Sequence, residues 1–140
     1  MAASGPVVVL LIDDDEDDRE FFQIAVLDTG INILCESAKG ATEGLAMLDA
    51  RTISPDFIFL DLNMPGINGL ACLQQLKSNP GTASIPVIIF STSSEQQDIV
   101  DSKKAGAMHF MTKPADLSQL SRDLTIFFTQ HFQNKDTHEK

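Results

Sequence analysis

The sequence predicts a single α/β domain in which helices cover both faces of a five-stranded parallel sheet. Five short runs of strand-forming residues alternate with five segments that carry helical spacing or helix-capping residues. Three of these runs, residues 7–12, 57–60 and 87–90, are apolar without polar alternation, which is typical of strands buried on both faces. Because crossovers between parallel strands are right-handed, this order predicts a doubly wound sheet. A length of 140 residues with 43% hydrophobic residues fits one domain with one core.

The predicted elements follow one another along the chain without a linker. The expected strands are residues 7–12, 31–36, 57–61, 87–90 and 107–112. The expected helices are residues 19–27, residues 41–50, a segment marked by Leu70, Leu73 and Leu76, a segment ending at Lys104, and a last helix capped by Asp116 with Leu117, Leu120, Leu124, Phe127 and Phe128 inward. We expect the fourth helix to be the least deeply packed, because only Ile99 and Val100 give it a strong apolar mark.

Turn and cap residues separate these elements. Pro65, Gly66 and Gly69 are expected to form a loop after the third strand. Ser93 or Ser94 is expected to cap the fourth helix, and Gln96 and Gln97 are placed to complete a capping box.

Composition restricts the class of partner and the compartment. The formal net charge of −10 argues against a nucleic-acid partner and favours cations or basic partners. Cys35 and Cys72 lie far apart in apolar segments, so free buried thiols are expected, which suits a reducing cytoplasm. No apolar run approaches 18 residues and no basic region precedes a long apolar one. We therefore expect a cytoplasmic protein with neither export signal nor membrane span.

Charged and hydroxyl side chains follow the predicted strands. Asp13 and Asp14 follow the first strand, Asp61 ends the third, and Ser91 and Lys113 follow the fourth and fifth. The carboxyl ends of parallel strands meet at one edge of a sheet, so these groups are expected to share a crevice. Clustered carboxylates repel one another unless a cation or protons neutralise them, and oxygen ligands favour Mg²⁺. The set indicates transfer of a phosphoryl group onto or off Asp61.

The same residues carry a family resemblance. The motifs are residues 11–15, residues 59–66, Ser91 and Lys113-Pro114, each at a predicted strand end and in the expected order. The chain resembles a response-regulator receiver domain of the chemotaxis-regulator type over residues 6–132, followed by a polar tail at 133–140. The resemblance implies the flavodoxin-like (βα)5 receiver fold. Family members commonly have the Lys-Pro bond in cis.

The resemblance also implies a role for each site residue. Asp61 is the expected phosphoacceptor, supplied by a histidine on a sensor kinase or a histidine phosphotransfer protein of a two-component phosphorelay. Asp14 and Asp61 are expected to hold Mg²⁺ with the backbone carbonyl of Asn63, and Asp13 assists through water. Ser91 and Lys113 contact the phosphoryl oxygens. The domain would catalyse only its own phosphorylation and dephosphorylation.

Signal output is expected at the face of the fourth helix, fifth strand and fifth helix, through a phosphorylation-dependent change in partner binding. Ser91 and Phe110 are the expected switch residues. Ser91 stands where threonine is more frequent, and Phe110 stands where many members have tyrosine, which this chain lacks altogether. The sequence names neither the kinase nor the output partner.

Other interpretations remain open for several residues. Glu16, Asp17 and Asp18 are expected to be solvated acids at a helix start, and Asp15 is balanced between a helix cap and the site. His109, His131 and His138 lack metal-ligand spacing and are expected to be non-catalytic.

Two other functions compete with a stand-alone phosphorylated receiver. One is a small Mg²⁺-dependent aspartate-nucleophile phosphatase, although Asn63 stands where such enzymes carry a second aspartate. The other is a degenerate receiver that binds its partner constitutively, against which the complete acidic set argues.

Overall fold

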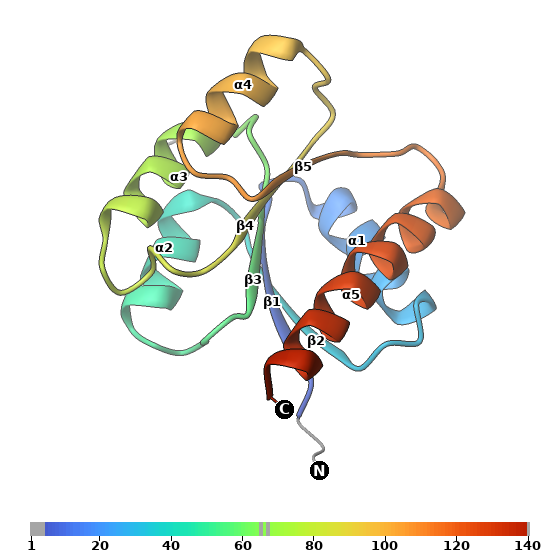
Figure 1. The fold of residues 1–140 in the computed structure, drawn as a ribbon. Coiled ribbons are helices and arrows are strands. Elements are labelled where there is room, and N and C mark those ends of the chain that lie inside the picture. Colours follow the sequence, from blue (N-terminus) through green and yellow to red (C-terminus); the bar gives the residue numbers. More distant parts are fainter. Residues whose placement is uncertain (1–4, 65, 67, 140) are drawn as a thin grey trace.

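The chain forms five β-strand and α-helix pairs in the predicted order (Figure 1). The computed structural model describes residues 5–139 except 65 and 67, and for residues 132–139 it describes the backbone alone. The strands are β1 Val7–Ile12, β2 Ile33–Ala38, β3 Phe57–Leu60, β4 Val87–Ser91 and β5 His109–Thr112. The helices are α1 Glu16–Asp28, α2 Ala41–Asp49, α3 Gly69–Ser78, α4 Gln96–Lys104 and α5 Leu117–Glu139. The backbone of α5 therefore continues through residues 133–139, which the sequence predicts to be a polar tail.

The five strands form one parallel sheet in the order β2-β1-β3-β4-β5. From β1 the chain first goes outward to β2 and then returns to β3 on the other side of β1. In such sheets, ligands bind in the crevice at the carboxyl ends of the strands where this reversal occurs. Ile12 pairs with Leu60, so the residues that follow β1 and β3 emerge next to each other.

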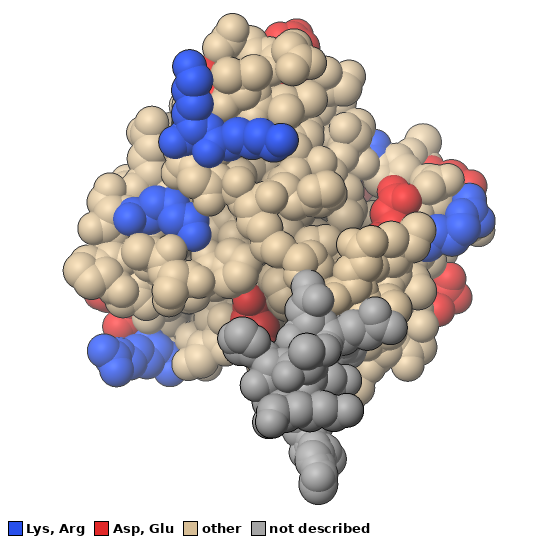
Figure 2. All heavy atoms as spheres, in the orientation of Figure 1, with Lys and Arg blue, Asp and Glu red and all other residues tan. Residues whose placement is uncertain are grey.

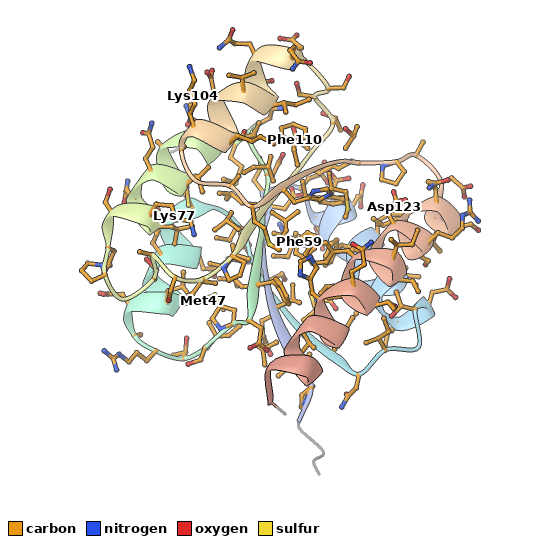
Figure 3. All side chains as sticks on the ribbon, in the orientation of Figure 1. Met47, Phe59, Lys77, Lys104, Phe110 and Asp123 are labelled. Carbon is orange, nitrogen blue, oxygen red and sulfur yellow. The ribbon has the colours of Figure 1, made fainter. Side chains whose placement is uncertain are left out.

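The helices cover both faces of the sheet, as the uninterrupted apolar strands predict. Helices α1 and α5 lie on one face, and α2, α3 and α4 lie on the other (Figure 1). On the first face, the rings of Phe22, Phe59 and Phe90 pack with centroid separations of 5.1 Å for Phe22–Phe59 and 5.3 Å for Phe22–Phe90 (Figure 3 labels Phe59). Such tilted and edge-to-face contacts are the favoured arrangement for buried aromatic rings. They anchor α1 against β3 and β4 below the site.

Two strands begin later than the sequence predicts, because turns occupy the preceding residues. The Ile31 amide donates to Thr29 Oγ1 at 3.1 Å, which places Ile31 in the turn that closes α1, and β2 starts at Ile33. The Ala107 amide donates to the Ser102 carbonyl at 3.0 Å in the turn after α4, so β5 starts at His109.

The predicted serine cap of α4 is wrong. Glu95 is the N-cap residue, and its side chain makes no capping hydrogen bond. Ser93 Oγ instead accepts from the Glu95 amide at 3.3 Å, in the turn before the helix, and donates to Asp98 Oδ2 at 2.5 Å. The expectation of shallow packing is confirmed, since Ser102 is the one buried residue of α4.

The two cysteines are free thiols, as expected, with Cys35 half-buried and Cys72 buried. Burial raises the pKa of Cys35 to about 12 and that of Cys72 to about 11, so both stay protonated at neutral pH. Figure 2 shows separate basic groups over α3 and α4 on the face in view, rather than one continuous basic patch. In the described part of the chain, no helix combines the length and apolar character that a membrane span requires.

Candidate functional site

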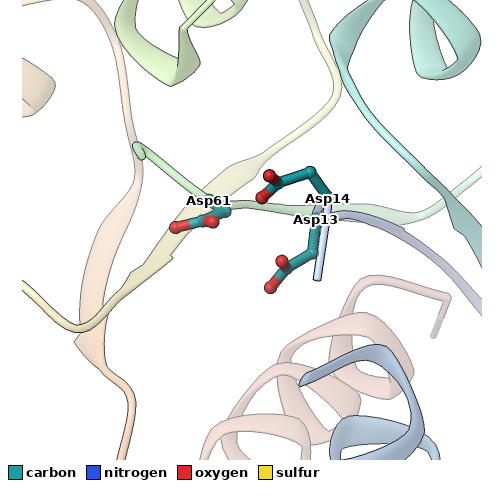
Figure 4. Close-up of side chains that lie close together, drawn as sticks. All are labelled: Asp13, Asp14 and Asp61. Carbon is teal, nitrogen blue, oxygen red and sulfur yellow. The ribbon is translucent and has the colours of Figure 1, made fainter. Parts of the chain in front are cut away.

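Three carboxylates meet at the carboxyl ends of β1 and β3, as the sequence predicts (Figure 4). Asp13 and Asp14 follow β1, and Asp61 follows β3. One carboxylate oxygen of each lies within 4.8 Å of the others. Asp13 and Asp61 are buried and Asp14 is exposed, so one side of the cluster faces solvent. Oxygen ligands grouped in this way fit a hard divalent cation.

Asp61 makes one hydrogen bond through its backbone amide and one through its carboxylate, both to backbone groups. Its amide donates to the Ile12 carbonyl at 3.0 Å, and its Oδ1 accepts from the Asn63 amide at 3.3 Å. Burial raises the pKa of Asp61 to about 6, and the charges of Asp13 and Asp14 act in the same direction while Lys113 opposes them. A cation that approaches this carboxylate would therefore stabilise its charged form.

Asp13 is buried with both carboxylate oxygens engaged. Oδ1 accepts from the Asp15 amide at 3.0 Å, and Oδ2 accepts from Lys113 Nζ at 2.8 Å. Burial raises the pKa of Asp13 in spite of these hydrogen bonds. Arg19 Nη1 donates to the Asp13 carbonyl at 2.9 Å and so ties α1 to the end of β1.

Lys113 is the cation of the site. Its Nζ lies 2.8 Å from Asp13 Oδ2 and 3.7 Å from Asp61 Oδ2. Burial lowers the pKa of the ammonium group, but its hydrogen bonds to Asp13 and Asp18 outweigh burial, so the net shift is upward and Lys113 stays charged. Its Nζ also lies 5.5 Å from the centroid of the Phe90 ring. The peptide bond to Pro114 is trans, unlike the bond common in the family that the chain resembles.

The expectation for Asp18 is wrong, because this residue is not simply a solvated acid. Asp18 Oδ2 accepts a hydrogen bond from Lys113 Nζ at 2.8 Å. The signal was present in the sequence, since Asp18 precedes the buried Phe22 and Ala25 by four and seven residues and so lies on the buried face of α1. Asp18 belongs to a continuous run of acidic residues, and within that run its helical spacing to Phe22 and Ala25 does not stand out.

The other acids at the start of α1 have structural roles or none. Asp15 is the N-cap residue, and its carboxylate accepts from the amides of Asp17 and Asp18 at 2.9 and 3.3 Å, which decides the question left open by the sequence. Glu16 and Asp17 are exposed, as expected.

The two expected switch residues lie on neighbouring strands. Ser91 is the buried last residue of β4, and its Oγ accepts from the Ser93 amide at 3.2 Å. Phe110 of β5 pairs with Ile89 of β4 and packs, partly buried, on the face covered by α2, α3 and α4 (Figure 3). The Ser91 hydroxyl is thus hydrogen-bonded to the loop that leads into α4.

Of the histidines, His109 begins β5 at the end of the sheet opposite the site, and His131 lies on α5. The His109 ring stacks on Phe127 with a centroid separation of 6.0 Å, and the His131 ring is tilted against it at 4.3 Å. The side chain of His138 and the predicted turn residue Pro65 lie outside the described residues.

Sequence reasoning assigned Gly69 to a loop and missed its role at the site. Gly69 is the first residue of α3, and its amide donates to the Leu62 carbonyl at 3.0 Å. A Cβ at this position would overlap the Asp61 carbonyl oxygen and Leu62 Cα. Only glycine lets α3 approach the backbone of the central carboxylate so closely.

Comparison with known proteins agrees with this geometry. A sequence model described as "Response regulator receiver domain" matches residues 9–125. The chain belongs to the response regulator receiver domain family. Such domains belong to two-component signalling systems.

Among individual relatives of this receiver domain, protein PilH of Pseudomonas aeruginosa is 37% identical over 87 residues, which cover 62% of this chain and 70% of PilH. The nitrate/nitrite response regulator NarL of Escherichia coli K12 is 33% identical over 102 residues, covering 73% of this chain but 45% of NarL. The chain therefore spans less than half of some relatives that it matches.

Two solved structures share the fold closely. The phosphorylated cyanobacterial phytochrome response regulator RcpA has a TM-score of 0.80 and 30% identity, with 88% of this chain and 91% of RcpA covered. The Mn²⁺-bound form of response regulator Rcp1 has a TM-score of 0.76 and 26% identity, with 86% and 90% covered.

Proposed function

We propose that this receiver domain accepts a phosphoryl group on Asp61, with Mg²⁺, from a histidine of a sensor kinase or a histidine phosphotransfer protein. The observation that carries the proposal is the meeting of three carboxylates and one ammonium group at the ends of β1, β3 and β5. RcpA, a related structure, is itself phosphorylated, and Rcp1 binds a divalent metal.

The residues present fit a divalent cation. Asp14 and Asp61 would hold it together with the backbone carbonyl of Asn63, and Asp13 would contribute through water. Mg²⁺ would supply positive charge that lowers the repulsion between the acceptor carboxylate and an incoming phosphoryl group. The raised pKa of Asp61 supports this assignment, since burial and neighbouring acids leave that carboxylate in need of a cation.

The chain's own groups perform the transfer. A carboxylate oxygen of Asp61 attacks phosphorus as the bond to the donor's histidine nitrogen breaks, so an acyl phosphate replaces the phosphohistidine. Lys113 Nζ, 3.7 Å from Asp61 Oδ2, is near enough to contact a phosphoryl oxygen after a small movement, and the Ser91 hydroxyl contacts another. With Mg²⁺ bound, these groups would let the domain catalyse its own phosphorylation and dephosphorylation.

Acetyl phosphate tests the proposal. Incubation with Mg²⁺ is expected to add the mass of one phosphoryl group to the intact protein, and removal of the metal with EDTA is expected to suppress the addition. Rapid turnover of unrelated phosphoesters would instead favour the phosphatase alternative. Absence of any adduct under conditions that label a known receiver would favour a constitutive binding module.

We propose that Ser91 and Phe110 report the new charge. A phosphoryl dianion on Asp61 draws the Ser91 hydroxyl toward it as a donor, which breaks the bond from the Ser93 amide and releases the loop before α4. The vacated space lets the Phe110 ring move. Both changes alter the face formed by α4, β5 and α5, where an output partner would bind in the cytoplasm.

The Ser91→Ala variant is therefore expected to be labelled yet poorly switched. Beryllofluoride, which mimics the acyl phosphate, should shift the amide signals of residues 94–120 in the wild type and much less in this variant. Phe110→Tyr serves as the control and is expected to respond like the wild type, because the ring is retained. Wild-type shifts confined to the strand ends would contradict this route.

A further inference from the structure

The Lys113 ammonium group lies between three carboxylates at unequal distances. Its Nζ is 2.8 Å from Asp13 Oδ2, 2.8 Å from Asp18 Oδ2 and 3.7 Å from Asp61 Oδ2. We propose that Asp18 is a positioning residue for phosphoryl transfer, which holds Lys113 just short of contact with Asp61. The inference rests on the proposed function, in which Lys113 serves the phosphoryl group.

The donors of Lys113 account for this geometry. A lysine ammonium group has three N–H donors, and two are used on Asp13 and Asp18. The distance to Asp61 exceeds that of an N–H···O hydrogen bond, so one donor on that side remains for an incoming oxygen. A phosphoryl group attached to Asp61 would place its oxygens nearer to Nζ than the present carboxylate.

Both anchors of Lys113 are fixed by the backbone. Asp13 lies at the end of a central strand, and Asp18 lies in the first turn of α1, which the Asp15 cap holds. The lysine comes from a distant part of the chain, 95 residues from Asp18, and its Nζ lies 5.5 Å from the centroid of the Phe90 ring. A flexible four-carbon side chain with one anchor retains much of its rotational freedom, and a second anchor removes it.

The second anchor also protects the acceptor oxygen. Without Asp18, the spare N–H donor and the positive charge would be drawn to Asp61, the remaining buried carboxylate within reach. A hydrogen bond from Lys113 to Asp61, closer than the present 3.7 Å ion pair, would occupy an oxygen that must attack phosphorus and would oppose the divalent cation. Asp18 thus keeps Asp61 free while Lys113 stays within reach of the transferred group.

Asp17 provides a matched control for Asp18. The two residues are adjacent in the first turn of α1, and each change to alanine alters the net charge equally. Asp17 is exposed and outside the ion pairs of Lys113. An effect of net charge or of the helix start would therefore be the same in both variants, whereas positioning of Lys113 would be lost only in Asp18→Ala.

Two measurements on the full chain test the proposal. With Mg²⁺ and acetyl phosphate, the initial labelling rate of Asp18→Ala is expected to fall about three- to tenfold, the range for one half-exposed charged hydrogen bond. Asp17→Ala should label like the wild type, and Asp18→Asn, which keeps an acceptor oxygen, should fall between them. In lysine-¹⁵N NMR, the Nζ signal of Lys113 should keep its wild-type chemical shift in Asp17→Ala and move in Asp18→Ala, because the ammonium group then pairs with Asp13 and Asp61.

The outcomes separate this inference from the proposed function. Labelling of Asp18→Ala at the rate of Asp17→Ala overturns the positioning role, whether or not the Lys113 signal changes. A slower rate with an unchanged Lys113 signal also overturns it, because Asp18 would then act by another route. Failure of the wild type to label refutes the proposed function, and the NMR comparison still decides whether Asp18 holds Lys113.

Discussion

Replacing Asp61 with asparagine is expected to abolish phosphoryl uptake from acetyl phosphate. The amide has no anionic oxygen with which to attack phosphorus, and the change removes one charge from the metal site while preserving side-chain size. Intact-mass measurement should show one added phosphoryl group on the wild type and none on Asp61→Asn. Asp28→Asn, the same chemical change at an exposed position of α1, should label normally. Undiminished labelling of Asp61→Asn would identify a different acceptor.

The same substitution is expected to stabilise the metal-free protein at neutral pH. The pKa of Asp61 is about 6 in the folded state, above its usual value of about 3.9 in an unfolded chain. Between these values the folded state binds more protons, so the free energy of unfolding falls as pH rises from 4 to 6 and stays low above that. Asp61→Asn lacks this penalty, which is about 1–3 kcal/mol for a shift of this size.

Urea unfolding at pH 5 and pH 7.5 without metal measures this effect. The stability advantage of Asp61→Asn should be larger at pH 7.5 than at pH 5. Saturating Mg²⁺ should reduce it, because the cation stabilises the wild-type carboxylate. An advantage that does not change with pH would mean that the Asp61 charge is already neutralised by its neighbours.

Gly69→Ala is expected to lower the free energy of unfolding by about 3 kcal/mol, at the upper end of the range for overpacking. The new Cβ would overlap backbone atoms of Asp61 and Leu62, which cannot yield as a flexible side chain can. We also expect slower labelling, because relief of the overlap moves the acceptor. Gly81→Ala, in the turn that follows α3, meets only Asn79 Oδ1 at 3.4 Å and should be tolerated. Equal stability of the two variants would show that α3 can shift without cost.

The strands and the central site could be predicted because their signals are local. Residues 7–12 and 57–60 are apolar without interruption, and each is followed directly by an aspartate, so a parallel arrangement brings Asp13 and Asp61 together. The residues that sequence reasoning misjudged depend on tertiary contacts. Asp18 meets a lysine 95 positions away, and Gly69 is required because the loop before α3 brings the backbone of Asp61 and Leu62 against it.

Competition between neighbouring hydrogen-bond partners explains the wrong predictions for the cap of α4 and the start of β2. Ser93 has the residue type of a helix cap, yet its hydroxyl donates a hydrogen bond to the carboxylate of Asp98 and accepts one from the Glu95 amide, and the helix begins beyond it. The start of β2 shifted because Thr29 captures the Ile31 amide. Such choices depend on differences of a single hydrogen bond, about 1 kcal/mol, which residue type alone does not decide.

The shallow packing of α4 lowers the free energy that a signal needs in order to change the conformation of this helix. Since this helix buries only Ser102, it should belong to the part of the fold that opens at the lowest free energy, well below global unfolding. A group that binds the closed and open forms of such a helix with different affinity can change their populations at little cost in free energy. Each tenfold change in the ratio of the two forms requires a difference of about 1.4 kcal/mol. A few hydrogen bonds made or lost at the strand ends would then be enough to change the population of this helix, while the aromatic packing under α1 and α5 stabilises the rest of the domain.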